Sequence, residues 1–221
     1  MSRIITVKGT GTVSSKPDTV VLTMDLDSRH AEYGKCMKLA TKELETLRRA
    51  IAGCQFADDA LKTTDFRIEA VYKSCKDSSG TWHDLFDVWC CSHGLKLEFP
   101  LDCERLTRVL AALAKCDSHP KIKVKFRVAD RDTICEALLR DAAQNARRKA
   151  EILCAASGVT LGELVTIDYN WGELSIFSRT NYENDCEGII FGSCSESEKG
   201  ISIDPEEVKN SDTVTFVWNI V

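Results

Sequence analysis

Residues 3–30, RIITVKGTGTVSSKPDTVVLTMDLDSRH, place two apolar runs on either side of a glycine-containing segment. In the second run, one set of alternate positions is apolar and holds Val20, Leu22, Met24 and Leu26. The other set is Val21, Thr23, Asp25 and Asp27. Because successive side chains of a strand point to opposite faces, this alternation predicts a half-buried strand with one wet face. We therefore expect strands over 4–8 and 18–27.

The segment Gly9–Gly11 between these strands allows two interpretations, a phosphate-binding loop or a turn. A dinucleotide-binding loop requires G-x-G-x-x-G at the start of a helix. Here no third glycine appears at that spacing, a strand pattern follows instead of a helix, and no Walker lysine motif occurs in the chain. We therefore interpret Gly9–Gly11, together with Ser14–Asp18, as a turn.

Apolar residues spaced by three and four predict three helices. The first follows Asp27 or Ser28, either of which can cap it, and ends at Gly53. The second takes Asp102 as its cap, and the third covers 131–157. The expected inward positions are Tyr33, Cys36, Met37, Ala40, Leu44, Leu47 and Ile51 in the first; Leu106, Val109, Leu110 and Leu113 in the second; and Ile134, Leu138, Ala142, Asn145, Ala146, Lys149, Ala150 and Leu153 in the third.

Alternating apolar residues predict the remaining strands. These strands cover 66–72, 84–99, 122–128, 164–169 and 214–220. The 84–99 run changes phase, and a bulge near His93–Gly94 would reconcile its two halves. The stretch 172–211 is rich in Ser, Glu, Asn, Asp and Gly, and we expect a flexible excursion with one short strand at Gly188–Phe191.

The predicted order β-β-α-β-β-α-β-α-β-β places strands next to strands. This order favours an α+β fold with a largely antiparallel sheet packed by about three helices. Strand–helix–strand occurs at 18–73 and again at 85–128, which indicates a duplicated unit without a residue-level repeat. We expect a single domain over 1–221, with the flexible excursion at about 172–211.

The composition is that of an ordinary globular protein, with 43% hydrophobic and 29% charged residues in 221. A formal net charge of −5 argues against sequence-independent nucleic-acid binding. No apolar run approaches the ~20 residues that span a bilayer. The start, MSRIITV, lacks the apolar region and cleavage site of a signal peptide. We expect a cytoplasmic protein, or one whose leader was removed and replaced by Met.

The chain contains 11 cysteines, an odd number. In a long chain with helix signals and no leader, we expect mostly reduced thiols rather than a disulfide framework. Cys36, Cys135 and Cys154 fall in helical patterns, where a thiol behaves as a small hydrophobic group. The odd count leaves a redox-responsive thiol open, and Cys186 and Cys194 in the excursion are the most accessible candidates.

The strongest metal-like cluster is Cys90-Cys91-Ser92-His93, with His83 nearby. Zinc sites usually combine C-x₂₋₄-C and H-x₃₋₅-H pairs, and this cluster has neither. In a strand, Cys90 and Cys91 face opposite sides, so both cannot easily hold one ion. A Cys/His nucleophile pair has no local support either, because the histidines adjoin polar or turn residues.

The remaining candidates are also typical of structural surfaces. The paired carboxylates Asp58–Asp59, Glu196/Glu198 and Glu206–Glu207 lie in polar segments, where a solvated carboxylate is the default. Basic residues of Asp141–Ala150 interleave with acidic ones, as ordinary helix pairs do. Asn145, on the inward stripe, needs a buried partner. We assign no catalytic, cofactor-binding or metal residues and expect no cofactor.

Six segments in a fixed order are informative together: Ile5–Val13, Lys16–Asp18, Thr64–Ile68, Ala137–Glu151, Gly158–Gly162 and 212–221. In these segments the chain resembles the SIMPL-domain family of YggE-like and periplasmic immunogenic proteins. The resemblance implies an α+β fold and an undefined activity with no agreed catalytic residues. It also implies a link to stress resistance, export of many members to the bacterial envelope, and large ring- or channel-like oligomers for some. The missing leader and the cysteine content depart from that pattern.

Two functions from different classes follow. The first is a non-enzymatic, self-assembling protein of undefined biochemical role, whose exposed strands or excursion mediate contacts between copies. The second is a small-molecule or redox enzyme that uses a thiol in a pocket assembled in three dimensions. We favour the first, which predicts a homo-oligomer. The sequence names no protein partner.

Overall fold

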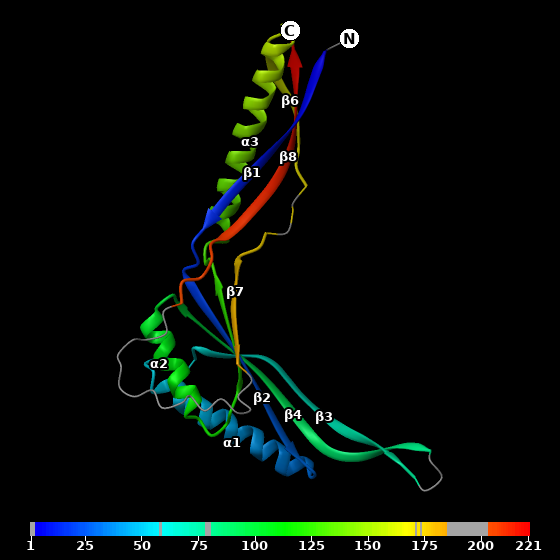
Figure 1. Ribbon diagram of the computed structural model, residues 1–221, viewed down its shortest axis with the longest axis vertical. Helices are drawn as coiled ribbons and strands as arrows, with labels where there is room; N and C mark the ends of the chain where they lie inside the picture. The colour runs from blue at the N-terminus through cyan, green and yellow to red at the C-terminus, as the bar shows by residue number, and fades with distance from the viewer. Residues whose placement is uncertain (1–2, 58, 78–80, 171, 173, 185–202) are drawn as a thin grey trace. The chain divides into compact units, whose positions relative to one another are not determined.

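The computed structural model describes residues 3–57, 59–77, 81–170, 172, 174–184 and 203–221. The elements in chain order are β1 (Ile4–Ser15), β2 (Thr19–His30), α1 (Tyr33–Ala52), β3 (Leu61–Lys76), β4 (Trp82–Pro100), α2 (Cys103–Ala114), β5 (Lys121–Arg127), α3 (Arg131–Ala156), β6 (Leu161–Asp168), β7 (Phe177–Asn184) and β8 (Val208–Ile220) (Figure 1). The three helices of the described chain and two antiparallel sheets confirm the predicted α+β class.

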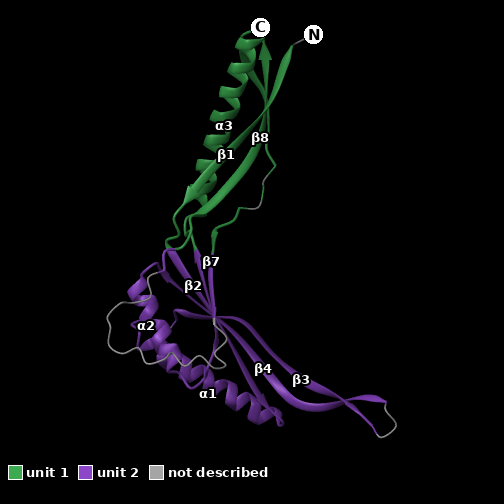
Figure 2. Cartoon of the chain, in the orientation of Figure 1, with its two compact units in different colours: residues 1–18, 127–179, 205–221 green, residues 19–126, 180–204 purple. Residues whose placement is uncertain are grey.

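The chain divides into two compact units, coloured separately in Figure 2. Unit 1 comprises 1–18, 127–179 and 205–221, and unit 2 comprises 19–126 and 180–204. The sheet of unit 1 has the strand order β1-β8-β6, and the second sheet has the order β3-β4-β2-β5-β7. Separate hydrophobic clusters lie in the two units, so each unit has a core of its own.

Unit 2 contains the two predicted strand–helix–strand segments, β2-α1-β3 and β4-α2-β5. They interlock: β2 and β4 pair at the centre, β3 lies beside β4, and β5 lies beside β2. This arrangement is the split βαβ, or ferredoxin-like, topology. The duplication predicted from element order is therefore present as topology.

The core of unit 2 follows the predicted alternation. Val20, Leu22 and Met24 of β2 are fully buried, as are Val109 of α2 and Leu47 of α1. These side chains belong to one cluster, which also takes in the apolar residues of β4 and β5. The inward stripes of α1 and α2 are thus confirmed, except at Tyr33 at the start of α1. That side chain is half-exposed, and its ring contacts the edge of Trp89.

Two capping predictions had different outcomes. Asp102 caps α2 as expected, because its carboxylate accepts hydrogen bonds from the N–H groups of Glu104 and Arg105 at 2.9 and 3.1 Å. The expectation that Asp27 or Ser28 caps α1 is wrong. Strand β2 runs on to His30, and both residues pair with β4 in the sheet.

The predicted bulge near His93–Gly94 lies at that level of the sheet but on the neighbouring strand. Strand β4 pairs with β2 without interruption, whereas the register of β3 shifts between Thr63 and Asp65. Thr64 is therefore the extra residue, opposite Gly94 and Leu95. A Cβ on Gly94 would lie 3.0 Å from Oγ1 of Thr64, so glycine gives the bulge room.

In unit 1, the glycine segment is not a turn. Strand β1 is continuous, and Gly9 pairs with Val214 while Gly11 pairs with Asp212 of β8. A Cβ on Gly9 would lie 2.0 Å from the carbonyl oxygen of Ala142 in α3. A Cβ on Gly11 would lie 2.1 Å from that of Leu138. The two glycines therefore let the helix backbone approach the strand closely.

Helix α3 packs on β1 and β8 with the predicted stripe of small and branched residues. The buried positions are Ile134, Leu138, Ala142, Ala146, Ala150 and Cys154. Gly158 follows the helix at a positive φ of 68° and ends it, as predicted. Leu153 was predicted to face inward but is half-exposed, because Cys154 takes the inward position at that turn.

The stretch 172–211 contains two described strand segments. Strand β7 joins the five-stranded sheet beside β5, and β8 begins at Val208. The apolar island Gly188–Phe191 lies outside the described residues, as do Cys186 and Cys194. Among the described helices, none combines the length and apolar composition that crossing a membrane requires.

Candidate functional site

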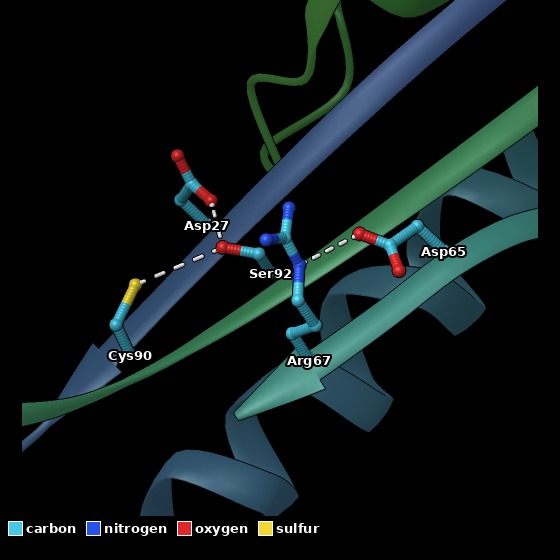
Figure 3. Close-up of polar contacts among 5 residues, drawn as sticks. All are labelled: Asp27, Asp65, Arg67, Cys90 and Ser92. Atoms are coloured by element: carbon cyan, nitrogen blue, oxygen red, sulfur yellow. Dashed lines mark hydrogen bonds and ion pairs between the residues drawn. The ribbon is translucent and has the colours of Figure 1, made fainter. Parts of the chain in front are cut away.

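A row of polar side chains crosses the face of the five-stranded sheet of unit 2 opposite α1 (Figure 3). Strand register places Asp27 of β2, Ser92 of β4 and Arg67 of β3 directly beside one another. The hydroxyl of Ser92 donates to Oδ1 of Asp27 at 2.7 Å, and Sγ of Cys90 lies 4.0 Å from the same hydroxyl. On β5, Nζ of Lys121 lies 3.2 Å from Oδ2 of Asp27. The row therefore ties together three neighbouring strands.

The chemistry of this row follows from the state of Asp27. The hydrogen bond from Ser92 lowers the pKa of Asp27, and Lys121 lowers it further, although partial burial acts in the opposite direction. The lowered pKa favours the ionised carboxylate, which accepts the hydrogen bond from Ser92 and pairs with Lys121. These contacts join β2 to β4 and to β5.

The metal-like cluster does not come together. Cys91 contacts Cys36 and Ala40 in an apolar cluster, while Cys90 adjoins Ser92 on the outer face. The two thiols thus face opposite sides, as the strand pattern predicted. Within the part of the chain that the structure describes, no three His, Cys, Asp or Glu side chains form a group that could hold a metal ion.

The histidines of that cluster each have another partner. Nε2 of His93 lies 3.0 Å from Oγ1 of Thr63, and its ring contacts the edge of Phe66. Nε2 of His83 lies 2.9 Å from Oδ2 of Asp77. Burial lowers the pKa of His93, and the nearby charge of Arg48 lowers it further. His93 is therefore held neutral inside unit 2.

The nine described cysteines are free thiols, and most are buried. Burial raises the pKa values of Cys36, Cys54 and Cys91. Since the thiolate is the reactive species, these three side chains are poor nucleophiles. Cys75 on β3 is the exposed thiol of the described set. Sequence reasoning did not single out Cys75, because only the position of β3 in the sheet reveals its exposure.

Each unit contains a cavity, and none of the described residues that line either one is a cysteine or histidine. The larger has a volume of about 600 Å³ and lies in unit 1, between Ser175–Arg179 and Glu206–Lys209. Glu206 and Glu207, one of the predicted carboxylate pairs, line it beside Arg179 and Lys209. The smaller, of about 250 Å³, lies by Ile51 and Leu61 in unit 2.

An exposed aromatic surface lies at the far end of β3 and β4. Strand β2 stops at His30, opposite Trp89, so within the described chain Trp82–Val88 pairs with β3 alone, at Val71–Lys76. We call these two segments the arm; Figure 1 shows it leaving the rest of the sheet. Its exposed large side chains are Trp82 (64%), Tyr72 (58%), Leu85 (57%) and Phe86 (46%). Such a group of apolar side chains is typical of an interaction surface.

Asn145 has the partner that its inward position requires. Its Oδ1 accepts a hydrogen bond from the backbone N–H of Thr10 in β1 at 3.2 Å. One turn earlier in α3, Oδ2 of Asp141 accepts from the N–H of Thr12 at 2.8 Å. The segment that the sequence presents as a mixed-charge helix face thus binds the backbone of a strand more than a hundred residues away.

These features define an α+β protein of two units that presents an aromatic arm and has no assembled metal group among its described residues. The chain belongs to the SIMPL family, described as a protein of unknown function (DUF541), which matches residues 5–218. The resemblance predicted from the sequence is confirmed, and the match covers both units. No curated protein matches the chain.

Proposed function

We propose that this SIMPL protein is a non-enzymatic protein that assembles with further copies of itself through the arm. The observation that carries the proposal is the exposure of Tyr72, Trp82, Leu85 and Phe86 on a ribbon of two strands. A two-stranded ribbon is marginally stable in water by itself. Contact with a partner would both stabilise the arm and cover its aromatic side chains.

The strand edges of the arm favour pairing with another strand. In the described sheet β3 is an edge strand, and the Trp82–Val88 segment of β4 extends beyond the end of β2. Both sides of the arm therefore present backbone N–H and C=O groups that no neighbouring strand of the described sheet covers. Edges of this kind are ready templates for strand addition.

The charges of the arm favour a second copy as its partner. Its β3 half carries Lys73 and Lys76, and its β4 half carries Asp84 and Asp87. Within one arm, Nζ of Lys73 lies 2.9 Å from Oδ1 of Asp87. When the β3 edge of one arm lies beside the β4 edge of the next, the same basic-to-acidic pairing recurs between copies. Such a contact joins two different edges and generates a ring or a filament.

The test is the solution mass, measured by light scattering on a sizing column with and without reductant. We expect the wild-type protein to form a discrete assembly that survives reductant, because the proposed contacts are not covalent. Substitution of Trp82→Ser with Phe86→Ser should return the mass to that of the 24.6 kDa chain. Both side chains lie outside the described cores, so the fold is expected to persist.

The matched control is Ile152→Ser on α3. Ile152 is 59% exposed, like the arm residues, but lies in unit 1. The substitution Ile152→Ser removes a similarly exposed apolar side chain away from the arm, and it should leave the assembly intact. A wild-type protein that remains a monomer at every concentration, or an arm variant that assembles normally, would overturn the proposal.

The proposal has two further parts, which concern the cellular compartment and a role in stress resistance. The free state of the nine described cysteines supports a reducing, cytoplasmic compartment. The family resemblance supports a role in stress resistance. If assembly underlies that role, cells carrying the Trp82→Ser/Phe86→Ser variant should survive oxidant exposure less well than cells carrying Ile152→Ser.

A further inference from the structure

Within the described part of the chain, the outer edge of β1 in unit 1 contacts side chains of α3 and pairs with no strand. Strand β1 is the terminal strand of the order β1-β8-β6. Lys8, Thr10 and Thr12 are two residues apart, so their backbone groups point to the same edge. The N–H groups of Thr10 and Thr12 donate to Asn145 and Asp141, and Nζ of Lys149 donates to the carbonyl oxygen of Lys8 at 3.2 Å.

The spacing of these three contacts matches the geometries of helix and strand. Asp141, Asn145 and Lys149 are four residues apart, which is a rise of about 6 Å along a helix. Residues two apart in a strand are separated by about 6.8 Å. Because α3 and β1 run in opposite directions here, each step of one turn in the helix meets the next outward-facing residue of the strand.

The two glycines of β1 make this alignment possible. Gly9 and Gly11 alternate with Lys8, Thr10 and Thr12 along the strand. A Cβ at Gly9 or Gly11 would lie only 2.0 or 2.1 Å from a carbonyl oxygen of α3, so the helix backbone would have to move away from the strand. The short side chains of Asp141 and Asn145 could then no longer reach the strand. The two glycines and the three polar side chains therefore act together. We call Gly9, Gly11, Asp141, Asn145 and Lys149 the edge seal.

We propose that the edge seal prevents β1 from pairing with a strand of a second copy. It occupies the N–H groups of Thr10 and Thr12 and the carbonyl oxygen of Lys8, which lie in the middle of the edge where a strand would add, and side chains cannot propagate the sheet. This inference is independent of the arm, which lies in unit 2. The proposal gives Asp141, Asn145 and Lys149 a role in limiting association between copies, although in the sequence they belong to an ordinary mixed-charge helix face.

The test compares Asp141→Ala/Asn145→Ala with Asp141→Asn/Asn145→Asp. The alanine pair removes both acceptors, whereas the second pair exchanges the two side chains and keeps a carbonyl or carboxylate oxygen at each position. In the alanine pair, we expect amide hydrogen exchange at Thr10 and Thr12 to accelerate roughly tenfold. Light scattering should show new, concentration-dependent species heavier than wild type. The exchanged pair should behave as wild type.

Two further variants keep the test decisive. Gln144→Ala/Arg148→Ala alters exposed side chains of α3 and should change neither exchange nor mass. Adding Thr12→Pro to the alanine pair removes an edge N–H and should abolish the heavier species.

If the alanine pair does not fold, Asn145→Ala alone retains two of the three contacts and serves instead. If the alanine pair shows faster amide exchange at Thr10 and Thr12 but an unchanged mass, the contacts only hold α3 on β1. If amide exchange is unchanged, the contacts do not protect these N–H groups. Either result overturns the proposal.

Discussion

At the scale of single residues, the chemistry of this protein is directed toward holding polar groups in fixed states. Asp27 is kept ionised by the Ser92 hydroxyl and Lys121, while burial keeps His93 neutral. A hydrogen bond and burial thus set these two protonation states. The contacts of Asp27 also join neighbouring strands of the sheet.

His93 makes the stability of unit 2 depend on pH. Its pKa lies below 6.5 in the folded state, so between the folded and unfolded pKa values the unfolded chain binds the proton and the folded chain does not. The stabilising contribution is complete above pH 6.5 and is lost as the pH falls through the lower, folded value. We expect the urea midpoint of unit 2 to decrease on acidification toward pH ~5, and His93→Gln to flatten that decrease.

The control for this effect is His119→Gln, since the His119 side chain is exposed and its contact with Cys116 is made by the backbone N–H, which the substitution retains. It should leave the pH dependence unchanged. If His93→Gln retains the full wild-type slope between neutral and acidic pH, the buried imidazole is not the group responsible.

At the scale of elements, the contact between α3 and β1 depends on the absence of two side chains. We expect Gly9→Ala to destabilise unit 1 by about 1–3 kcal/mol or more, because its Cβ would meet helix backbone that cannot rotate away. The measurement is the loss of hydrogen-exchange protection in α3 and β8. Gly34→Ala is the matched control: no atom lies within 4 Å of the added Cβ, and alanine should stabilise α1 by about 0.5–1 kcal/mol. A neutral Gly9→Ala would contradict the close packing.

Local patterns predicted the elements well, and failed where a distant segment decides the structure. The alternation in β2 and the stripes of α2 and α3 reflect burial against neighbours, and they identified most core residues correctly, Leu153 and Lys149 of α3 being the exceptions. Gly9 and Gly11 appear as turn residues in the sequence because the helix that requires them begins at Arg131. The length of β2 was underestimated because pairing with β4, not its own composition, carries the strand to His30.

The functional features show the same limit. The need of Asn145 for a partner followed from its position on the helix stripe, but the identity of the partner, Thr10, did not. The arm was not predicted, because exposure of Phe86 and Tyr72 depends on where β2 ends and α1 begins. In an alternating strand, an aromatic residue ordinarily indicates a buried face.

At the scale of the whole molecule, one family match covers two units with separate cores. We expect the units to lose structure in separate steps. Leu97 is fully buried in unit 2, and Leu97→Ala should cost about 2–5 kcal/mol and accelerate amide exchange in the elements of unit 2 only.

Phe216→Ala provides the reciprocal case, since Phe216 is buried in unit 1 and stacks on Trp218. It should accelerate exchange in β1, β8 and α3 while leaving β4 protected. If each substitution accelerates exchange equally throughout the chain, the two units instead unfold as one cooperative body.

The antiparallel pairing of β1 with β8 also determines how the chain responds to mechanical force. Ile4 pairs with Asn219 at one end of the ladder, and Ser15 pairs with Val208 at the other. A load applied through the two chain ends therefore acts on a single rung and breaks the pairs one after another, as in peeling, instead of shearing them all at once. The backbone bonds between Thr160 and Val221 hold the β8 side of that rung in place. Tension would accordingly strip β1 first and separate it from α3 at low force.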